Sequence, residues 1–156
     1  DLKHSRTVHS LSHLLARHFN VTFCFVSPVT LSLPTELSNI FKSYDTIMYD
    51  TTDLVKALAE TDVLYVTRIQ KERFATVEEY QTVQGAYCID KQLLKTLPEE
   101  SIILHPLPRV DELSTDVDTD PRAAYFRQME YGLHVRMALL AWLIESRRMN
   151  KKNSEC

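Results

Sequence analysis

Short apolar runs alternate with segments of helical periodicity along most of this chain. Strands are expected over residues 21–26, 46–49, 63–66 and 101–104, and helices over residues 7–19, 35–41, 52–60, 77–83 and 91–97. A last helix is expected from Pro121, capped by Asp120, to about Arg148, with an interruption near Gly132. This alternation predicts an α/β domain of three layers, with a parallel sheet, helices on both faces and a long C-terminal helical segment.

Composition narrows the class of protein further. The 156 residues are 44% hydrophobic, enough for one domain with a real core. No apolar run reaches the 18 residues or so that a membrane helix needs, so we expect no membrane partner. A net charge of −3 argues against a nucleic-acid partner. Three scattered cysteines indicate reduced thiols in a cytoplasmic protein. Only two glycines occur, which excludes a glycine-rich phosphate loop or dinucleotide fingerprint.

The two ends of the chain suggest a domain of a longer protein. It opens at Asp1 without Met, already inside what reads as a strand-to-helix turn, so the first strand of the expected sheet is missing. It closes with a polar segment that we expect to be frayed. We therefore divide it into a folded domain, residues 1–144, and a polar C-terminal tail, residues 145–156.

Two expected strands break abruptly into dense polar loops. Residues 63–66 lead into Arg68, Gln70 and Glu72, where Glu72 could hold the Arg68 guanidinium by an ion pair. Ligands of open α/β sheets bind beyond the carboxyl ends of strands, and arginine forks suit carboxylates or phosphates. At the start of the first helix, Lys3, Arg6 and free N–H groups could hold an anion, although a solvated turn capped by Ser5 is an equal alternative. These segments predict a site for a small, multiply anionic substrate.

The second strand end carries a rigid pair of backbone acceptors. Pro106 and Pro108 remove two N–H donors and stiffen the loop, which leaves the carbonyls of Pro106 and Leu107 free to accept from a substrate amide or amine. Arg109, Asp111 and Glu112 could be internal ion pairs of this loop.

Two other features have ordinary structural interpretations. His9 and His13 lie four residues apart on a helix, but no third ligand is suggested, so we favour structural or surface histidines and expect no metal site. The apolar series Met129, Leu133, Met137, Leu140 and Leu143 is most simply core packing of the last helix.

Four segments in register resemble the aspartate-binding half of aspartate transcarbamoylase, in its eukaryotic branch. They are residues 1–10, 65–73, 105–112 and 120–128, and the similarity runs to about Ile144. The resemblance implies a Rossmann-like domain and transfer of a carbamoyl group from carbamoyl phosphate to L-aspartate, giving N-carbamoyl-L-aspartate and phosphate in pyrimidine synthesis. No cofactor is implied. The implied partners are a carbamoyl-phosphate-binding domain and, for complete catalytic chains, a homotrimer.

The resemblance also implies roles for individual residues. Arg6 and Arg68 would grip the two aspartate carboxylates, beside Gln70 and Lys3, and Arg6, Arg68 and Gln70 would form the catalytic set. The residues that the resemblance implies for substrate binding are Lys3, Arg6, Thr7, Arg68, Gln70, Pro106, Leu107 and Pro108. The Leu107–Pro108 peptide bond is expected to be cis, as in the family.

Departures from the family keep two alternatives open. Ser5 stands where the family usually has glycine, and the family's Ser-Thr-Arg-Thr phosphate motif is absent, so we expect no activity from this chain alone. One alternative is another transcarbamoylase with a different amino acceptor, although two arginines placed for a dicarboxylate favour aspartate. The other is a non-catalytic assembly module of the same fold.

Overall fold

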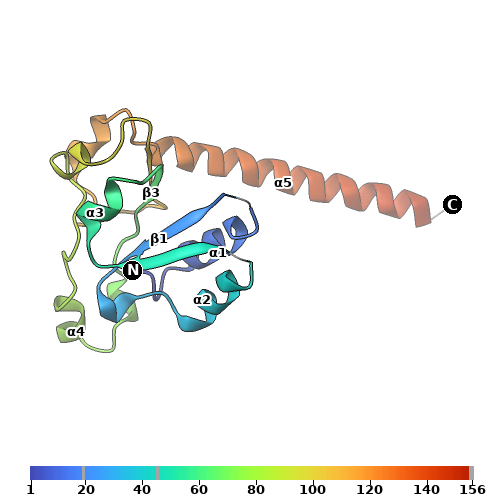
Figure 1. The fold of residues 1–156 in the computed structure, drawn as a ribbon. Coiled ribbons are helices and arrows are strands. Elements are labelled where there is room, and N and C mark those ends of the chain that lie inside the picture. Colours follow the sequence, from blue (N-terminus) through green and yellow to red (C-terminus); the bar gives the residue numbers. More distant parts are fainter. Residues whose placement is uncertain (19, 45, 155–156) are drawn as a thin grey trace.

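The computed structural model describes residues 1–18, 20–44 and 46–154, with backbone alone for residues 150–154. Helices and strands alternate along the chain, as predicted (Figure 1). The strands are β1 (Thr22–Val26), β2 (Ile47–Thr51), β3 (Val63–Tyr65) and β4 (Ile102–Leu104). The α-helices are α1 (Arg6–Leu15), α2 (Thr35–Lys42), α3 (Leu54–Leu58), α4 (Val77–Gln81) and α5 (Tyr125–Ser154). The α/β class is confirmed.

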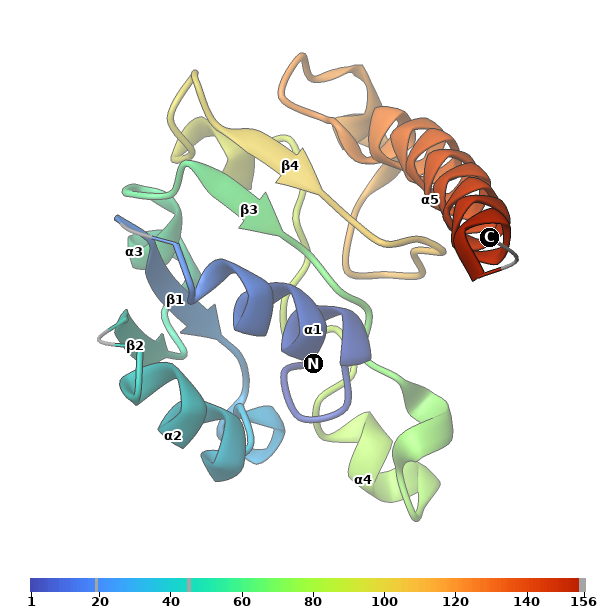
Figure 2. The same cartoon turned by 90° about the vertical axis from the view of Figure 1, so that its right-hand side faces the viewer.

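All strand pairing among these elements is parallel, which requires crossover connections; α2 lies in the one between β1 and β2, and α4 in the one between β3 and β4. β1 pairs with β2, where Phe23 lies opposite Met48. β3 pairs with β4, where Leu64 lies opposite Ile103. The strands therefore form two two-stranded ladders, and Figure 2 shows β2, β1, β3 and β4 following one another across the molecule, with α1 in front.

Two apolar cores hold the layers together. The first joins the chain start, α2 and β1, where the rings of Phe25 and Phe41 lie 6.1 Å apart and nearly parallel. The second lies around β3, β4 and the start of α5, with Ile103 and Tyr125 fully buried. Side chains of this size contribute roughly 1.5–3 kcal/mol each on burial, so these clusters are the main stabilising contribution.

Several expected boundaries are wrong for local reasons. Asp120 does not cap a helix that begins at Pro121, because α5 begins at Tyr125 and the Asp120 carboxylate accepts from Arg122 instead. Residues 91–97 contain only a 3-10 turn, Leu93–Lys95. α3 is capped by Asp53 rather than by a threonine, through a 3.0 Å bond from the Lys56 N–H. α1 ends at Leu15, and Phe19 lies outside the described residues.

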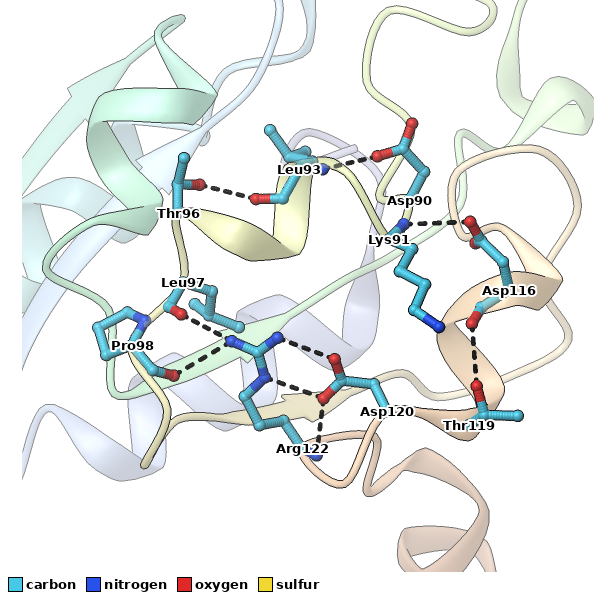
Figure 3. A network of polar contacts seen from close by, with 10 residues as sticks. All are labelled: Asp90, Lys91, Leu93, Thr96, Leu97, Pro98, Asp116, Thr119, Asp120 and Arg122. Carbon is cyan, nitrogen blue, oxygen red and sulfur yellow. Dashed lines mark hydrogen bonds and ion pairs between the residues drawn. The ribbon is translucent and has the colours of Figure 1, made fainter.

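A polar network fastens the segment before α5 to the segment before β4 (Figure 3). The Arg122 guanidinium donates to both carboxylate oxygens of Asp120, at 2.9 and 2.8 Å. Its Nη1 also donates to the carbonyls of Leu97, at 2.6 Å, and Pro98, at 3.4 Å. Nearby, the Lys91 N–H donates to Asp116 Oδ2 at 3.2 Å. One planar side chain thus joins segments about 25 residues apart in sequence.

The long helix α5 departs most from expectation. No break occurs at Gly132, and α5 extends away from the body of the molecule (Figure 1). The apolar series predicted to be core is exposed, with Leu140 at 62% of its surface, so that prediction is wrong for this chain. The series is Met129, Leu133, Met137, Leu140 and Leu143. The physical reason is that β4 contacts only the start of the helix.

No change of secondary structure marks the predicted division after residue 144, because α5 continues through it to Ser154. The division between residues 1–144 and 145–156 therefore stays a prediction. Of the helices formed by the described residues, none is both long and apolar enough to cross a membrane.

Candidate functional site

A pocket of about 200 Å³ lies where β3 and β4 end and α1 begins. Its lining comes from three segments that are distant in sequence: the start of α1, the loop after β3 and the loop after β4. The lining residues are Ser5, Arg6, Thr7, Thr67, Arg68, Gln70, His105, Pro106, Leu107 and Pro108. Parallel strands bring their carboxyl ends to one edge, which explains why these loops meet.

Seven of the eight residues predicted to bind substrate line this pocket, and Lys3 does not. Lys3 is exposed, and its backbone N–H donates to the Leu31 carbonyl at 3.1 Å. The sequence did not single out Ser5, Thr67 and His105 as site residues, although they line the pocket too. The sequence could have indicated Thr67 and His105, because each directly follows an expected strand and belongs to a loop in which other site residues were predicted.

The turn before α1 is held from both sides. The N–H groups of Leu2 and Lys3 both donate to the Leu31 carbonyl at 3.1 Å, and Leu2 is buried in the first core. His9 Nε2 lies 2.7 Å from the Leu2 carbonyl oxygen, so this histidine has a structural contact. Ser5 occupies the N-cap position but makes no side-chain cap bond; its Oγ lies 3.0 Å from Thr7 Oγ1. Arg6 therefore begins a helix whose start is fixed.

The Asp1 carboxylate joins two walls of the pocket. It accepts from the N–H of His4 at 3.0 Å and from the N–H of Gln70 at 3.2 Å. These residues belong to the turn before α1 and to the loop after β3. Because one carboxylate bonds to both, the Arg6 and Arg68 segments keep a fixed mutual position.

Arg68 is oriented by Glu72, as predicted. Its guanidinium donates to both carboxylate oxygens of Glu72, with an Nη1–Oε2 distance of 3.1 Å. The hydrogen bond from Arg68 lowers the pKa of Glu72 to about 2, and the bond to Glu72 raises the pKa of Arg68. The pair is exposed, so its effect is orientation of the fork more than stability.

The loop after β4 is held by a buried histidine. His105 Nδ1 accepts from the Leu107 N–H at 2.8 Å, so the ring proton lies on Nε2 and donates to Glu112 Oε1 at 2.8 Å. Burial by itself raises the pKa of Glu112, but the bonds from His105 and from the Val110 N–H outweigh it, and the net pKa is lowered. The Leu107–Pro108 bond is cis, which confirms the expectation.

The ion pair of Arg109 forms with a different partner from those expected within this loop. Arg109 donates to Asp118, with an Nη2–Oδ2 distance of 2.7 Å, and not to Asp111 or Glu112. Asp118 also accepts from the Tyr125 hydroxyl, so the loop is tied to the first residue of α5. The bond from Arg109 lowers the pKa of Asp118 to about 2, while burial raises the pKa of Tyr125 to about 12.

Two arginines, Arg6 and Arg68, and the loop residues Pro106 and Leu107 line the same pocket, whose volume suits a small metabolite. Among the residues that the structure describes, no group of three or more His, Cys, Asp or Glu side chains could hold a metal ion. Fold and pocket together define an α/β domain with an arginine-lined pocket at the carboxyl edge of parallel strands.

Comparison with known proteins makes this class specific. Residues 1–143 match the family model for the aspartate/ornithine carbamoyltransferase Asp/Orn binding domain. The multifunctional protein pyr1-3 of Dictyostelium discoideum is 50% identical over 141 residues, which cover 90% of this chain and 6% of that protein. The chloroplastic aspartate carbamoyltransferase of Oryza sativa subsp. japonica is 44% identical over 148 residues, covering 94% of this chain and 41% of that protein.

A solved structure agrees. Aspartate transcarbamoylase from Trypanosoma cruzi, in complex with carbamoyl phosphate and aspartate, superposes with a TM-score of 0.81 at 43% identity, covering 90% of this chain and 47% of that one. The chain belongs to the aspartate/ornithine carbamoyltransferase family, as its Asp/Orn binding domain. It spans less than half the length of these relatives.

Proposed function

We propose that this chain is the aspartate-binding half of an aspartate carbamoyltransferase, which transfers the carbamoyl group of carbamoyl phosphate to L-aspartate in pyrimidine biosynthesis. The observation that carries the proposal is the meeting of Arg6 and Arg68 with the Pro106–Pro108 loop in one pocket. Aspartate has two carboxylates and one amine; the two arginines that line the pocket would suit the carboxylates, and the carbonyls of Pro106 and Leu107 would serve as acceptors.

The proposed mechanism is positional. Arg6 and Arg68 each receive one carboxylate, and Gln70 and Thr7 supply further polar contacts at the pocket wall. The Pro106 and Leu107 carbonyls accept from the amino group and the carbamoyl group, so the amine is held towards the carbamoyl carbon. The amine attacks that carbon and gives up a proton. The bond from the carbon to the phosphate oxygen breaks, and phosphate leaves with the electron pair of that bond and takes up the proton. Two fixed cations lower the barrier by holding the amine in attack geometry.

The other half of the reaction needs other residues. The carbamoyl-phosphate site belongs to a second domain in this proposal, and complete chains assemble as a homotrimer in the cytoplasm. Support for a second domain comes from the relatives, of which this chain spans less than half. The exposed apolar surface of α5 supports association with a further protein surface.

The choice of amino acceptor tests the proposal. In the complete enzyme, initial rates of carbamoyl transfer are measured with L-aspartate and with L-ornithine at equal concentrations. Two pocket arginines predict turnover with aspartate and repulsion of the ornithine ammonium group. The 156-residue chain alone serves as a control and should form no product. Preference for ornithine, or absence of turnover with both, would reject the proposal.

A further inference from the structure

The edge of β4 that faces away from β3 is occupied by the segment that leads into α5. The Ile103 N–H donates to the Arg122 carbonyl at 2.8 Å, and the Ala124 N–H donates to the Ile103 carbonyl at 2.9 Å. Ile103 and Ala123 form an isolated parallel bridge at the same place. This short ladder stops where α5 begins, so the first turn of the helix lies beside the end of β4 (Figure 2).

Gln128 continues this ladder with its side chain. The N–H groups of alternate residues point to the same edge of a strand, so the next donor on this edge after Ile103 is the N–H of His105. Gln128 Oε1 accepts from this N–H at 3.0 Å, in the place of a backbone carbonyl. Gln128 lies in the first turn of α5, and its own N–H donates to the Ala124 carbonyl at 2.8 Å. The helix therefore fixes the residue that holds the His105 N–H.

His105 passes this constraint to the pocket, because it is buried and yet lines the pocket wall. Its Nδ1 accepts from the Leu107 N–H at 2.8 Å, and its Nε2 donates to Glu112 at 2.8 Å. The backbone N–H and both ring nitrogens of one residue are thus each bonded to a different group. Gln128 lies outside the pocket lining, so any effect that it has on a bound substrate acts through His105.

The same helix holds the loop after β4 at a second point. Asp118 accepts from Arg109 and from the hydroxyl of Tyr125, the first residue of α5. The start of α5 therefore fixes both ends of residues 105–109, through Gln128 at one end and through Asp118 at the other. The two loop carbonyls that are proposed to accept from the substrate amine lie between these fixed ends.

We propose that Gln128 is a positioning residue of the aspartate site, which sets the place of the two loop carbonyls through the N–H of His105. This role rests on the proposed function, because those carbonyls matter only where an amine binds. Gln128 acts on the amine end of the substrate, whereas Arg6 and Arg68 receive the carboxylates. Its loss should therefore lower kcat without weakening the binding of a dicarboxylate that has no amine.

The experiment uses three substitutions of Gln128 in the complete enzyme. Gln128→Met keeps a long side chain without the amide acceptor, Gln128→Lys offers donors only, and Gln128→Glu keeps an acceptor oxygen. Glu130→Gln, at an exposed position of the same helix, is the matched control. For each variant, kcat and KM for aspartate are measured together with Tm. The inhibition constant of succinate, which has two carboxylates and no amine, is measured as well.

The methionine and lysine variants should lose kcat by roughly 10- to 100-fold, the effect of misplacing a reacting group by up to about 1 Å. Their succinate inhibition constants should stay near that of the wild type, and Gln128→Glu should recover most of kcat. A merely structural role would lower Tm and leave the kcat of the folded enzyme unchanged. Wild-type kcat in both acceptor-free variants would overturn the proposal, as would equal losses in all three variants. A succinate constant that rises in step with the loss of kcat would also overturn it.

Amide hydrogen exchange gives a readout apart from turnover. In Gln128→Met and Gln128→Lys, the amides of residues 105 and 107 should exchange severalfold faster than in the wild type and in Glu130→Gln. The amides of β3, residues 63–65, should keep their rates. Unchanged exchange at residue 105 in an enzyme that turns over aspartate would overturn the role of Gln128 alone. A wild-type enzyme without turnover would overturn the proposed function and this role with it.

Discussion

Arg68 has a defined direction only because a carboxylate four residues later holds its fork. Both oxygens of Glu72 accept from the guanidinium, and the pocket receives the side chain already oriented. The arginine thus supplies charge and Glu72 supplies geometry. An exposed pair of this kind contributes little to folding, so its loss should affect aspartate use more than stability.

Replacing Glu72 by Gln tests this separation. In the complete enzyme we expect a severalfold higher KM for aspartate with an almost unchanged Tm, measured by steady-state kinetics and thermal unfolding. Glu78→Gln, on the exposed surface of α4, is the matched control.

The Glu72 pKa of about 2 lies below its usual 4.5, so the ion pair is complete above pH 4.5 and is lost as the pH falls towards 2. A Glu72→Gln enzyme with wild-type KM would contradict the orienting role.

His105 is expected to matter for folding through its two ring nitrogens. His105→Ala removes the acceptor of the Leu107 N–H and the donor to the buried Glu112. Leaving such groups unsatisfied costs about 1–3 kcal/mol each, so the urea midpoint should fall clearly. Glu112→Gln keeps an acceptor oxygen for His105, so the urea midpoint of this variant should fall less. Equal midpoints for His105→Ala and wild type would refute this account of the loop.

At the scale of elements, Arg122 connects the segments on either side of β4. Arg122→Ala removes the bonds to Asp120 and to the Leu97 and Pro98 carbonyls. Charged hydrogen bonds of this kind contribute about 1.5–3 kcal/mol, and we expect a loss of unfolding free energy in that range by urea denaturation. Arg122→Lys should recover only part of it, because an ammonium group cannot reproduce the planar fork. Full recovery by lysine would show that charge alone suffices.

The contact between the loop after β4 and the start of α5 should contribute to stability in a pH-dependent way. Asp118 accepts from Arg109 and Tyr125, and its pKa of about 2 lies below the usual 3.8. Its contribution to stability is therefore complete above pH 3.8 and is lost as the pH falls towards 2. We expect Asp118→Asn to lower Tm at pH 7 and to flatten the decline of Tm between pH 4 and 2. Asp111→Asn, at an exposed position of the same loop, is the control. Parallel pH profiles for wild type and Asp118→Asn would contradict this link.

The elements that could be predicted from the sequence are those whose local sequence pattern agrees with their tertiary environment. Residues 63–65 form a strand because their β-branched and apolar run pairs with β4, and the polar loop follows where that pairing ends. The Asp120 prediction was wrong because an aspartate before a proline resembles a helix start, whereas the Asp120 carboxylate pairs with Arg122 two residues later. The exposed face of α5 could not be read from periodicity, which marks apolar positions but not what covers them.

At the scale of the whole molecule, the site is a meeting of three segments and not a local motif. Arg6, Arg68 and Leu107 are far apart in sequence, and the parallel topology gathers them at one edge. The sequence indicated most of the pocket because each segment carries its own signal, an arginine fork or a proline pair. It missed that Asp1 joins two of the walls, because that contact spans 69 positions between Asp1 and Gln70.

The most direct test of the central claim is the aspartate dependence of carbamoyl transfer in the complete enzyme carrying Arg68→Ala. Loss of a charged, bidentate contact of about 1.5–3 kcal/mol predicts a fall in kcat/KM for aspartate of roughly 10- to 150-fold, with Tm nearly unchanged. Arg73→Ala, in the same loop but outside the pocket lining, should keep kcat/KM near that of the wild type. An aspartate dependence in Arg68→Ala equal to that of Arg73→Ala would contradict the claim that this pocket binds aspartate.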